Sequence, residues 1–210
     1  MANSMVHWNG DQVVVFDVET TGLEVGYHEI IQIALVALDS NFKLRKGVIP
    51  FCVSLKPEYP ERIDFDAMEV NKQEVADLVN RGLDPIKVID LIGHWLDKLE
   101  LPYTRSGSRK RVRFLGHNVS FDISFLKQLL GLQQYNDWFS YISLDTMDMA
   151  GFINNHCAMN AEPIPFPKVG LSYLCNVLNV EHRRKHDALE DCLATAECCR
   201  EMVGKGQWVA

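Results

Sequence analysis

A short apolar run that leads directly into two carboxylates sets the strongest constraint on this chain. Residues 13–16, Val-Val-Val-Phe, are β-branched or aromatic, as expected of a buried strand. Asp17 and Glu19 follow at once, and Gly22 indicates a turn. Side chains two apart on a strand share a face, so the two carboxylates should lie side by side. Such a pair is costly to bury unless a divalent cation compensates, although alone it is weak evidence, because most such pairs are simply solvated.

The order of strands and helices favours a mixed α/β sheet covered by helices. Two more strands are expected early, at residues 30–38 and 47–55, with a hairpin-type connection at 39–41. Strands and helices then alternate along the chain. We expect strands at 112–115 and 141–144, and helices from Asp64 or Asp66 towards Leu78, at 85–99, at 120–130, after Asp145, near 170–178 and at about 186–203.

Length and composition indicate one domain. The 210 residues suit a single domain, with a core at about 13–204. No apolar run approaches the roughly 18 residues of a transmembrane helix. The polar residues 1–11 also lack the apolar core of a signal peptide. We therefore expect a cytoplasmic protein without a membrane partner.

Cysteine spacing and net charge bear on the kind of site. The six cysteines form no Cys-x-x-Cys pair, so we expect reduced, buried thiols and no zinc site. The formal net charge of −7 is unexpected for a protein that holds nucleic acid with a broad basic surface. It does not exclude a nucleic-acid enzyme, because part of the charge would belong to carboxylates that bind cations.

Two later motifs add further acidic residues and a histidine. The segment 116–122, Gly-His-Asn-Val-Ser-Phe-Asp, follows the strand at 112–115 and places Asp122 in the first turn of a helix. Alone, Asp122 is better explained as an acidic residue that complements the helix N-terminus, and Asn118 as a residue that shapes the turn. His186 and Asp191, at the start of the last helix, are expected to reach one cleft. His182 is interpreted as a loop residue whose replacement by alanine is nearly silent.

The three motifs in this order resemble the DEDDh exonucleases, the DnaQ-like and RNase T-like 3′→5′ exonuclease family of the RNase H-like superfamily. The resemblance covers about residues 13–204. It implies an RNase H-like α/β fold, with a five-stranded mixed sheet flanked by α-helices. The catalytic residues that it implies are Asp17, Glu19, Asp122, His186 and Asp191.

The resemblance also implies the chemistry. Two divalent cations, Mg²⁺ or Mn²⁺, suit such oxygen-rich ligands. By resemblance, Asp17, Glu19 and Asp191 hold one ion, and Asp17 with Asp122 holds the other. His186 would take the proton from the attacking water, and the product would be a nucleoside 5′-monophosphate.

Substrate contacts are expected in two places by the same resemblance. The backbone of Thr20 and Thr21 would meet the sugar at the 3′ end, and Leu23 would wedge against the last base, unless Leu23 is a core residue. The segment that would line the terminal-nucleotide pocket, or alternatively form an ordinary amphipathic helix, contains Phe65, Met68 and Asn71.

The strongest positive cluster lies in the stretch 105–113. It is expected to contact phosphates upstream of the cleaved end, or else to be a solvated loop. Its cations are Arg105, Arg109, Lys110, Arg111 and Arg113.

Several functions stay open at this point. The first is a free-standing exonuclease on single-stranded DNA or RNA 3′ ends, and the second an RNA-trimming or oligoribonucleotide-clearing enzyme. The third is a proofreading subunit with a polymerase partner, although the chain ends seven residues after Val203 and such subunits often carry a longer tail. The sequence decides neither between DNA and RNA nor between a monomer and a homodimer.

Overall fold

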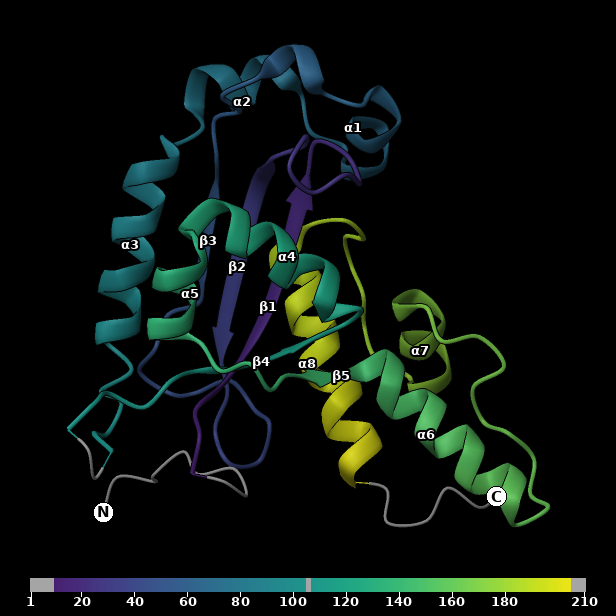
Figure 1. Cartoon of the computed structure of the whole chain (residues 1–210). Helices are drawn as coiled ribbons and strands as arrows, with labels where there is room; N and C mark the ends of the chain where they lie inside the picture. Colours follow the sequence, from purple (N-terminus) through teal and green to yellow (C-terminus); the bar gives the residue numbers. More distant parts are fainter. Residues whose placement is uncertain (1–9, 105–106, 205–210) are drawn as a thin grey trace.

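A five-stranded mixed sheet forms the centre of the computed structural model, which describes residues 10–104 and 107–204 (Figure 1). The strands are β1 (Val13–Thr20), β2 (Ile30–Ala37), β3 (Phe51–Ser54), β4 (Arg113–Gly116) and β5 (Leu144–Asp145), in the order β3-β2-β1-β4-β5. Strand β2 runs antiparallel to both of its neighbours, whereas β1, β4 and β5 are parallel. The mixed α/β sheet predicted from the sequence is confirmed.

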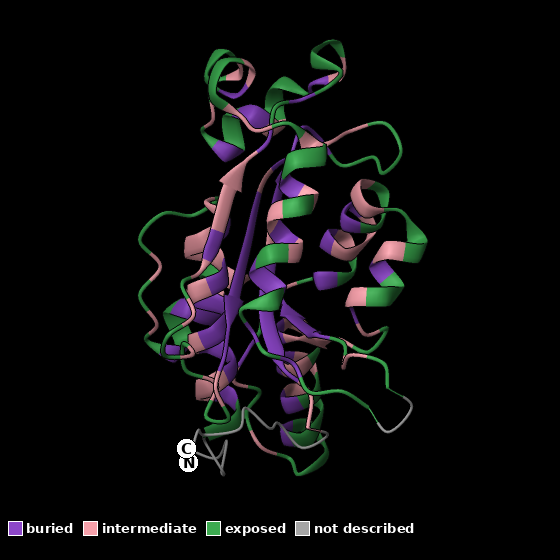
Figure 2. Cartoon of the chain, turned by 90° about the vertical axis from the view of Figure 1, so that its left-hand side faces the viewer, coloured by how far each residue is buried: buried purple, intermediate pink, exposed green. Residues whose placement is uncertain are grey.

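Helices cover both faces of this sheet. One face packs against α3 (Pro85–Asp97), α4 (Val119–Leu130) and α5 (Leu132–Trp138). The other face packs against α8 (Ala188–Gly204), with α6 (Thr146–Met159) and α7 (Leu171–Leu178) beside it. The short helices η1 (Pro60–Arg62), α1 (Phe65–Asn71) and α2 (Val75–Arg81) lie beyond one end of the sheet. Figure 2 shows the strands as the buried layer between these helices.

The alternation of side chains along β1 fixes where the carboxylates point. Val14 and Phe16 belong to the cluster under α3 and α4, whereas Val13 and Val15 pack against α8. Asp17 and Glu19 continue the second series, so they face α8. Each buried apolar side chain contributes about 1.5–3 kcal/mol, and turning the strand over would exchange its two sets of neighbours. The core therefore holds both carboxylates towards the last helix.

Several element boundaries differ from the sequence-based expectation for identifiable reasons. The helix expected to run towards Leu78 is divided into α1 and α2, because Lys72 between them adopts a left-handed conformation, with φ of 54°. Strand β3 begins only at Phe51, after Gly47, which has φ of +84°. Helix α5, which we did not expect, starts directly after Gly131.

The last strand and the last helix also begin later than expected. Strand β5 comprises only Leu144 and Asp145, and Tyr141, where the strand was expected to begin, is almost fully exposed. Helix α8 begins at Ala188, because His186 has φ of 61° and cannot belong to a right-handed helix.

The six cysteines are all free thiols, and five are buried, with Cys52 only half-buried. Cys192, Cys198 and Cys199 lie in α8. Across residues 10–104 and 107–204, no helix has both the length and the apolar character needed to cross a bilayer.

Candidate active site

Asp122 reaches β1 at the point where the sheet ladder stops. Strand β4 pairs with β1 only as far as Val15 and Leu115. Beyond that point, the backbone N–H of Val18 donates a hydrogen bond of 3.1 Å to Oδ1 of Asp122. Asp122 is only 4% exposed. Its carboxylate therefore sits at the edge of β1, between the positions of Asp17 and Glu19, and does more than complement a helix N-terminus.

A tight turn between β4 and α4 delivers Asp122 to this edge. Asn118 has φ of 59°, a left-handed conformation that asparagine tolerates better than most residues, which confirms its interpretation as a turn residue. A Cβ at Gly116 would come within 2.6 Å of Val119, so only glycine fits there. The Asp145 carboxylate accepts from the N–H groups of Asn118 (3.1 Å) and Val119 (2.8 Å). Asp145 thus clamps the turn from β5.

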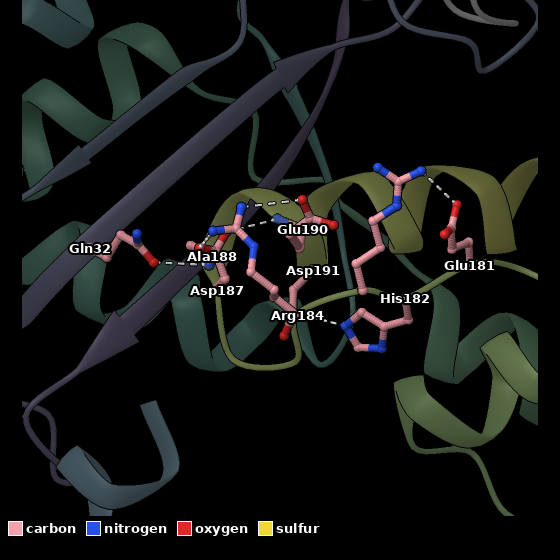
Figure 3. Close-up of polar contacts among 9 residues, drawn as sticks. Gln32, Glu181, His182, Arg184, Asp187, Ala188, Glu190 and Asp191 are labelled. Atoms are coloured by element: carbon pink, nitrogen blue, oxygen red, sulfur yellow. Dashed lines mark hydrogen bonds and ion pairs between the residues drawn. The ribbon is translucent and has the colours of Figure 1, made fainter. Parts of the chain in front are cut away.

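The start of α8 supplies the remaining two residues. Potential ligand atoms of Glu19, His186 and Asp191 all lie within 4.8 Å of one another. The helix start is fixed by the Gln32 side chain of β2, whose Oε1 accepts from the Ala188 N–H at 3.0 Å (Figure 3). The left-handed backbone at His186 carries a cost of about 1–3 kcal/mol, a kind of strain that clusters at functional sites.

The carboxylates of this site raise one another's pKa values. Burial, and secondarily the charges of Asp122 and Asp191, raise the pKa of Asp17 well above its usual range. Burial is also the main cause that raises the pKa of Glu19 to about 8, with Asp191 as the next contributor. The pKa of Asp122 is likewise raised to about 8 by burial, against the opposing effect of its hydrogen bond from Val18. Such a crowded set of oxygen donors fits hard divalent cations, which would neutralise the repulsion.

A hollow of about 470 Å³ opens onto this cluster from the side of α7. Asp17, His186 and Asp191 line it, and the cations Lys168 and Lys185 lie around it. A second, larger groove of about 720 Å³ begins on the other side of His186 and extends towards Asn71. His186 and Lys185 border both hollows, so the cluster is accessible to a ligand from two directions.

Leu23 and Phe65 lie in exposed positions close to the end of β1. Leu23 is 79% exposed, which excludes its interpretation as a core residue, and Phe65 is 80% exposed. Their segments are joined by a hydrogen bond of 2.8 Å from the Asp64 N–H to the Thr21 carbonyl. Both apolar side chains are therefore free to contact a base.

Thr20 and Thr21, which were expected to contact the substrate, form hydrogen bonds within the fold. The Thr20 hydroxyl donates to the Gly22 carbonyl at 2.7 Å. The Thr21 N–H donates to the Glu29 carbonyl at 2.8 Å, and its hydroxyl accepts from the Glu29 N–H at 2.9 Å. The Thr21 carbonyl accepts one hydrogen bond, from Asp64, and retains a second lone pair, so the backbone contact of Thr21 with a terminal sugar stays a prediction. Both residues are buried and build the turn after β1.

Met68 and Asn71 also have structural partners. Met68 is buried in a small apolar cluster with Ile31, Ile63 and Leu78, so it has a packing role, and its contact with a nucleotide stays a prediction. The amide of Asn71 donates to the Thr20 carbonyl at 2.9 Å, and Asn71 borders the larger groove. Of the three residues predicted to contact the nucleotide, Phe65 is exposed and Asn71 borders the larger groove.

The basic stretch lies at the wrong end of the sheet for the role predicted from the sequence. It precedes β4, whereas the carboxylates lie where β4 ends (Figure 1). Arg109 pairs with Asp97 at 2.7 Å, and Arg113 is buried and pairs with Asp11 at 2.7 Å. Arg105 lies outside the described residues. The cations beside the cluster are instead Lys168 and those of residues 183–185, which the sequence shows as Arg-Arg-Lys directly before His186.

His182 belongs to the site, contrary to its interpretation as an uninvolved loop residue. Its Nε2 lies 2.6 Å from Oδ1 of Asp191. The side chain is only 6% exposed, although the residue lies outside any helix or strand. Nothing in the local spacing signals this contact, which depends on how the segment before α8 folds back.

Comparison with known proteins gives the family. The family model RNase_T, described as "Exonuclease", matches residues 14–199. DNA polymerase III PolC-type from Listeria innocua is 29% identical over 194 residues, which cover 90% of this chain but 11% of that protein. Ribonuclease T from Wigglesworthia glossinidia brevipalpis is 25% identical over 205 residues, which cover 94% of this chain and 87% of that protein. The chain thus spans about a tenth of the length of the PolC-type relatives it matches.

A solved structure supports the fold. Exonuclease I from E. coli, in complex with a dA16 oligonucleotide, has a TM-score of 0.71 and 19% identity, covering 93% of this chain and 41% of that one. This likeness confirms the RNase H-like fold. The family match over residues 14–199 shows that the chain belongs to the RNase_T exonuclease family.

Proposed function

We propose that this chain, acting as a single domain, is a 3′→5′ exonuclease that removes nucleoside 5′-monophosphates from single-stranded nucleic acid. The observation that carries the proposal is the meeting of Asp17, Glu19, Asp122, His186 and Asp191 at the open edge of β1. Family membership supports hydrolysis of nucleic acid as the reaction class.

The donor set supports two divalent cations, Mg²⁺ or Mn²⁺, as cofactors. Asp17, Glu19 and Asp191 would hold one ion, and Asp17 with Asp122 the other. When bound, the ions would supply positive charge at the attacking and departing oxygens of the phosphodiester. His186, exposed at the border of both hollows, accepts the proton of the attacking water.

The exposed apolar groups support a substrate with an unpaired end. Leu23 and Phe65 present apolar surface on which a terminal base can stack. Lys168 and Lys185 provide positive charge for the phosphates beside it. The match to Ribonuclease T over most of its length favours RNA as a second candidate substrate. Because the chain is also similar to DNA polymerase III PolC-type proteins, association with a polymerase is a further alternative.

The direct test uses single strands labelled at the 5′ end, in DNA and RNA versions, with a duplex for comparison. With Mg²⁺ or Mn²⁺ we expect a ladder that shortens from the 3′ end and releases 5′-mononucleotides. EDTA should stop the reaction, and Zn²⁺ should restore it poorly because it prefers nitrogen and sulfur ligands. Digestion that continues in EDTA, or cleavage of a closed circular strand, would exclude the proposed mechanism.

Lys185 should contribute to binding of the strand. It is exposed beside His186, and no ion pair of Lys185 is found within residues 10–104 and 107–204. Lys185→Ala should raise the KM for a 12-nucleotide strand several-fold. The slope of log K against log salt should become shallower by about 0.7, as for the loss of one phosphate contact on a single strand.

The matched control is Arg111→Ala, which removes an exposed cation at the opposite end of the sheet. We expect its KM and salt dependence to equal those of the wild type. Equal losses in the two variants would mean that binding follows total charge and that the position of Lys185 is irrelevant.

A further inference from the structure

A second histidine is buried against one of the acidic residues of the site. His182 and Asp191 are 6% and 14% exposed in their side chains, and Nε2 lies 2.6 Å from Oδ1. An ionised carboxylate only accepts hydrogen bonds, so Nε2 is the donor in this contact. Hydrogen bonds to ionised groups are short and stronger than neutral ones. Figure 3 shows the ring of His182 directed at Asp191 from the segment that precedes α8.

The other ring nitrogen of His182 shows that this arrangement carries a cost. Nδ1 is buried, and no hydrogen-bond partner for it is found in the described part of the chain. A buried polar atom without a partner costs about 1–3 kcal/mol. An apolar side chain of similar size would fill the same space without that cost. The imidazole is therefore accounted for by its bond to Asp191 better than by packing.

Ion pairs keep the segment that carries His182 against the start of α8. Arg184 lies 3.5 Å from Asp187 and 3.3 Å from Glu190. The Glu190 N–H also donates to Oδ1 of Asp187 at 3.2 Å, so Asp187 caps the first turn of α8. The segment that carries His182 is therefore fixed by these ion pairs, and the bond from His182 restricts rotation of the Asp191 carboxylate.

We propose that His182 is a positioning residue that fixes the Asp191 carboxylate for cation binding. Its bond holds Oδ1 and leaves the second oxygen for the cation site shared with Glu19 and His186. The inference rests on the proposed function, since it requires a cation there. Partners that orient metal ligands typically change metal affinity or activity 10- to 100-fold when they are removed.

The test compares Mn²⁺ binding, measured by electron paramagnetic resonance without substrate, in the wild type, His182→Leu and His182→Gln. Leucine removes the donor, and we expect Mn²⁺ affinity to fall about 10- to 100-fold. The amide nitrogen of glutamine replaces Nε2–H, so that variant should bind Mn²⁺ within about 3-fold of the wild type. The KM for a short oligonucleotide should stay unchanged in all three proteins.

His94→Leu is the control, because His94 is an exposed histidine of α3 whose Nδ1 bonds only within its own helix, to the Asp90 carbonyl. Its Mn²⁺ affinity should equal that of the wild type. If His182→Leu does not fold, as judged by circular dichroism, His182→Asn gives the same comparison, since its shorter side chain is polar but falls short of Asp191.

Three results would overturn the inference alone: unchanged Mn²⁺ affinity in folded His182→Leu, tighter binding in that variant, or a glutamine variant as defective as leucine. Tighter binding would mean that His182 competes with the cation for Asp191. A wild-type protein that binds no Mn²⁺ and digests no strand would overturn the proposed function as well.

Discussion

Replacing Asp122 with asparagine should abolish most nuclease activity and at the same time make the metal-free protein more resistant to heat. Asparagine retains an oxygen that accepts from the Val18 N–H, so the edge of β1 keeps its hydrogen bond. It lacks the negative charge that a cation needs. We expect kcat to fall by about 10³-fold or more, which corresponds to about 4 kcal/mol of transition-state stabilisation.

The stability gain should depend on pH in a defined direction. Burial raises the pKa of Asp122 to about 8 in the folded protein, whereas an unfolded aspartate titrates near 3.9. Between about pH 4 and pH 8 the folded state therefore holds a proton that the unfolded state has released. Stability falls as pH rises through this window. Asparagine does not titrate, so the advantage of the variant should be absent near pH 4 and complete near pH 8.

Melting curves in EDTA at pH 5 and pH 8 measure this effect. At pH 8 the Tm of Asp122→Asn should exceed that of the wild type by at least about 3 °C, the shift expected from roughly 1 kcal/mol in a domain of this size. Asp137→Asn, at an exposed position of α5, should show no such gain. A Tm of Asp122→Asn clearly below that of the wild type at pH 8 would mean that Asp122 mainly supports the strand edge.

Removal of the His186 imidazole should cause the second large loss. Positioned general bases contribute roughly 10²- to 10⁴-fold, and we expect His186→Ala to lower kcat by about that factor. Binding of Mn²⁺ and of oligonucleotide should persist, because the four carboxylates remain. A large loss of Mn²⁺ affinity would instead identify His186 as a metal ligand, a role that its proximity to Glu19 and Asp191 also permits.

His186→Gly separates the imidazole from the backbone conformation. With φ of 61°, position 186 suits glycine better than any residue with a Cβ, by about 1–2 kcal/mol. The glycine variant should therefore be as inactive as the alanine variant but more stable in thermal melts. Near-wild-type turnover in both variants would show that another group takes the proton.

The parts of the site that local pattern dictates were predictable from the sequence. The apolar run 13–16 could only be a buried strand, and its alternation placed Asp17 and Glu19 on one face. Asp122 was predicted in the first turn of a helix because a glycine and an asparagine marked the turn before it. These features depend on neighbours within a few residues, which a single sequence displays.

The parts that depend on distant segments were not predictable. His182 looks like any polar loop residue until the segment before α8 folds back onto Asp191. The basic stretch shows its charge in the sequence but not the end of the sheet at which it lies. The backbone N–H and carbonyl of Thr21 form hydrogen bonds with Glu29 and Asp64, which lie 8 and 43 residues away, and no local pattern reveals these partners.

The shortness of the β1–β4 ladder makes strand length itself a functional constraint. The ladder ends at Val15, so the N–H of Val18, three residues later, is available to a side chain. An insertion that extended β4 by a few residues would offer this N–H a backbone carbonyl instead. Asp122 would then lose the hydrogen bond that holds its carboxylate beside β1. Changes in the length of the connection at Gly116 and Asn118 should thus be tolerated far less than in other surface loops. The reason is that the Val18 N–H can bond either to a longer β4 or to Asp122, and only the second arrangement keeps Asp122 in the active site.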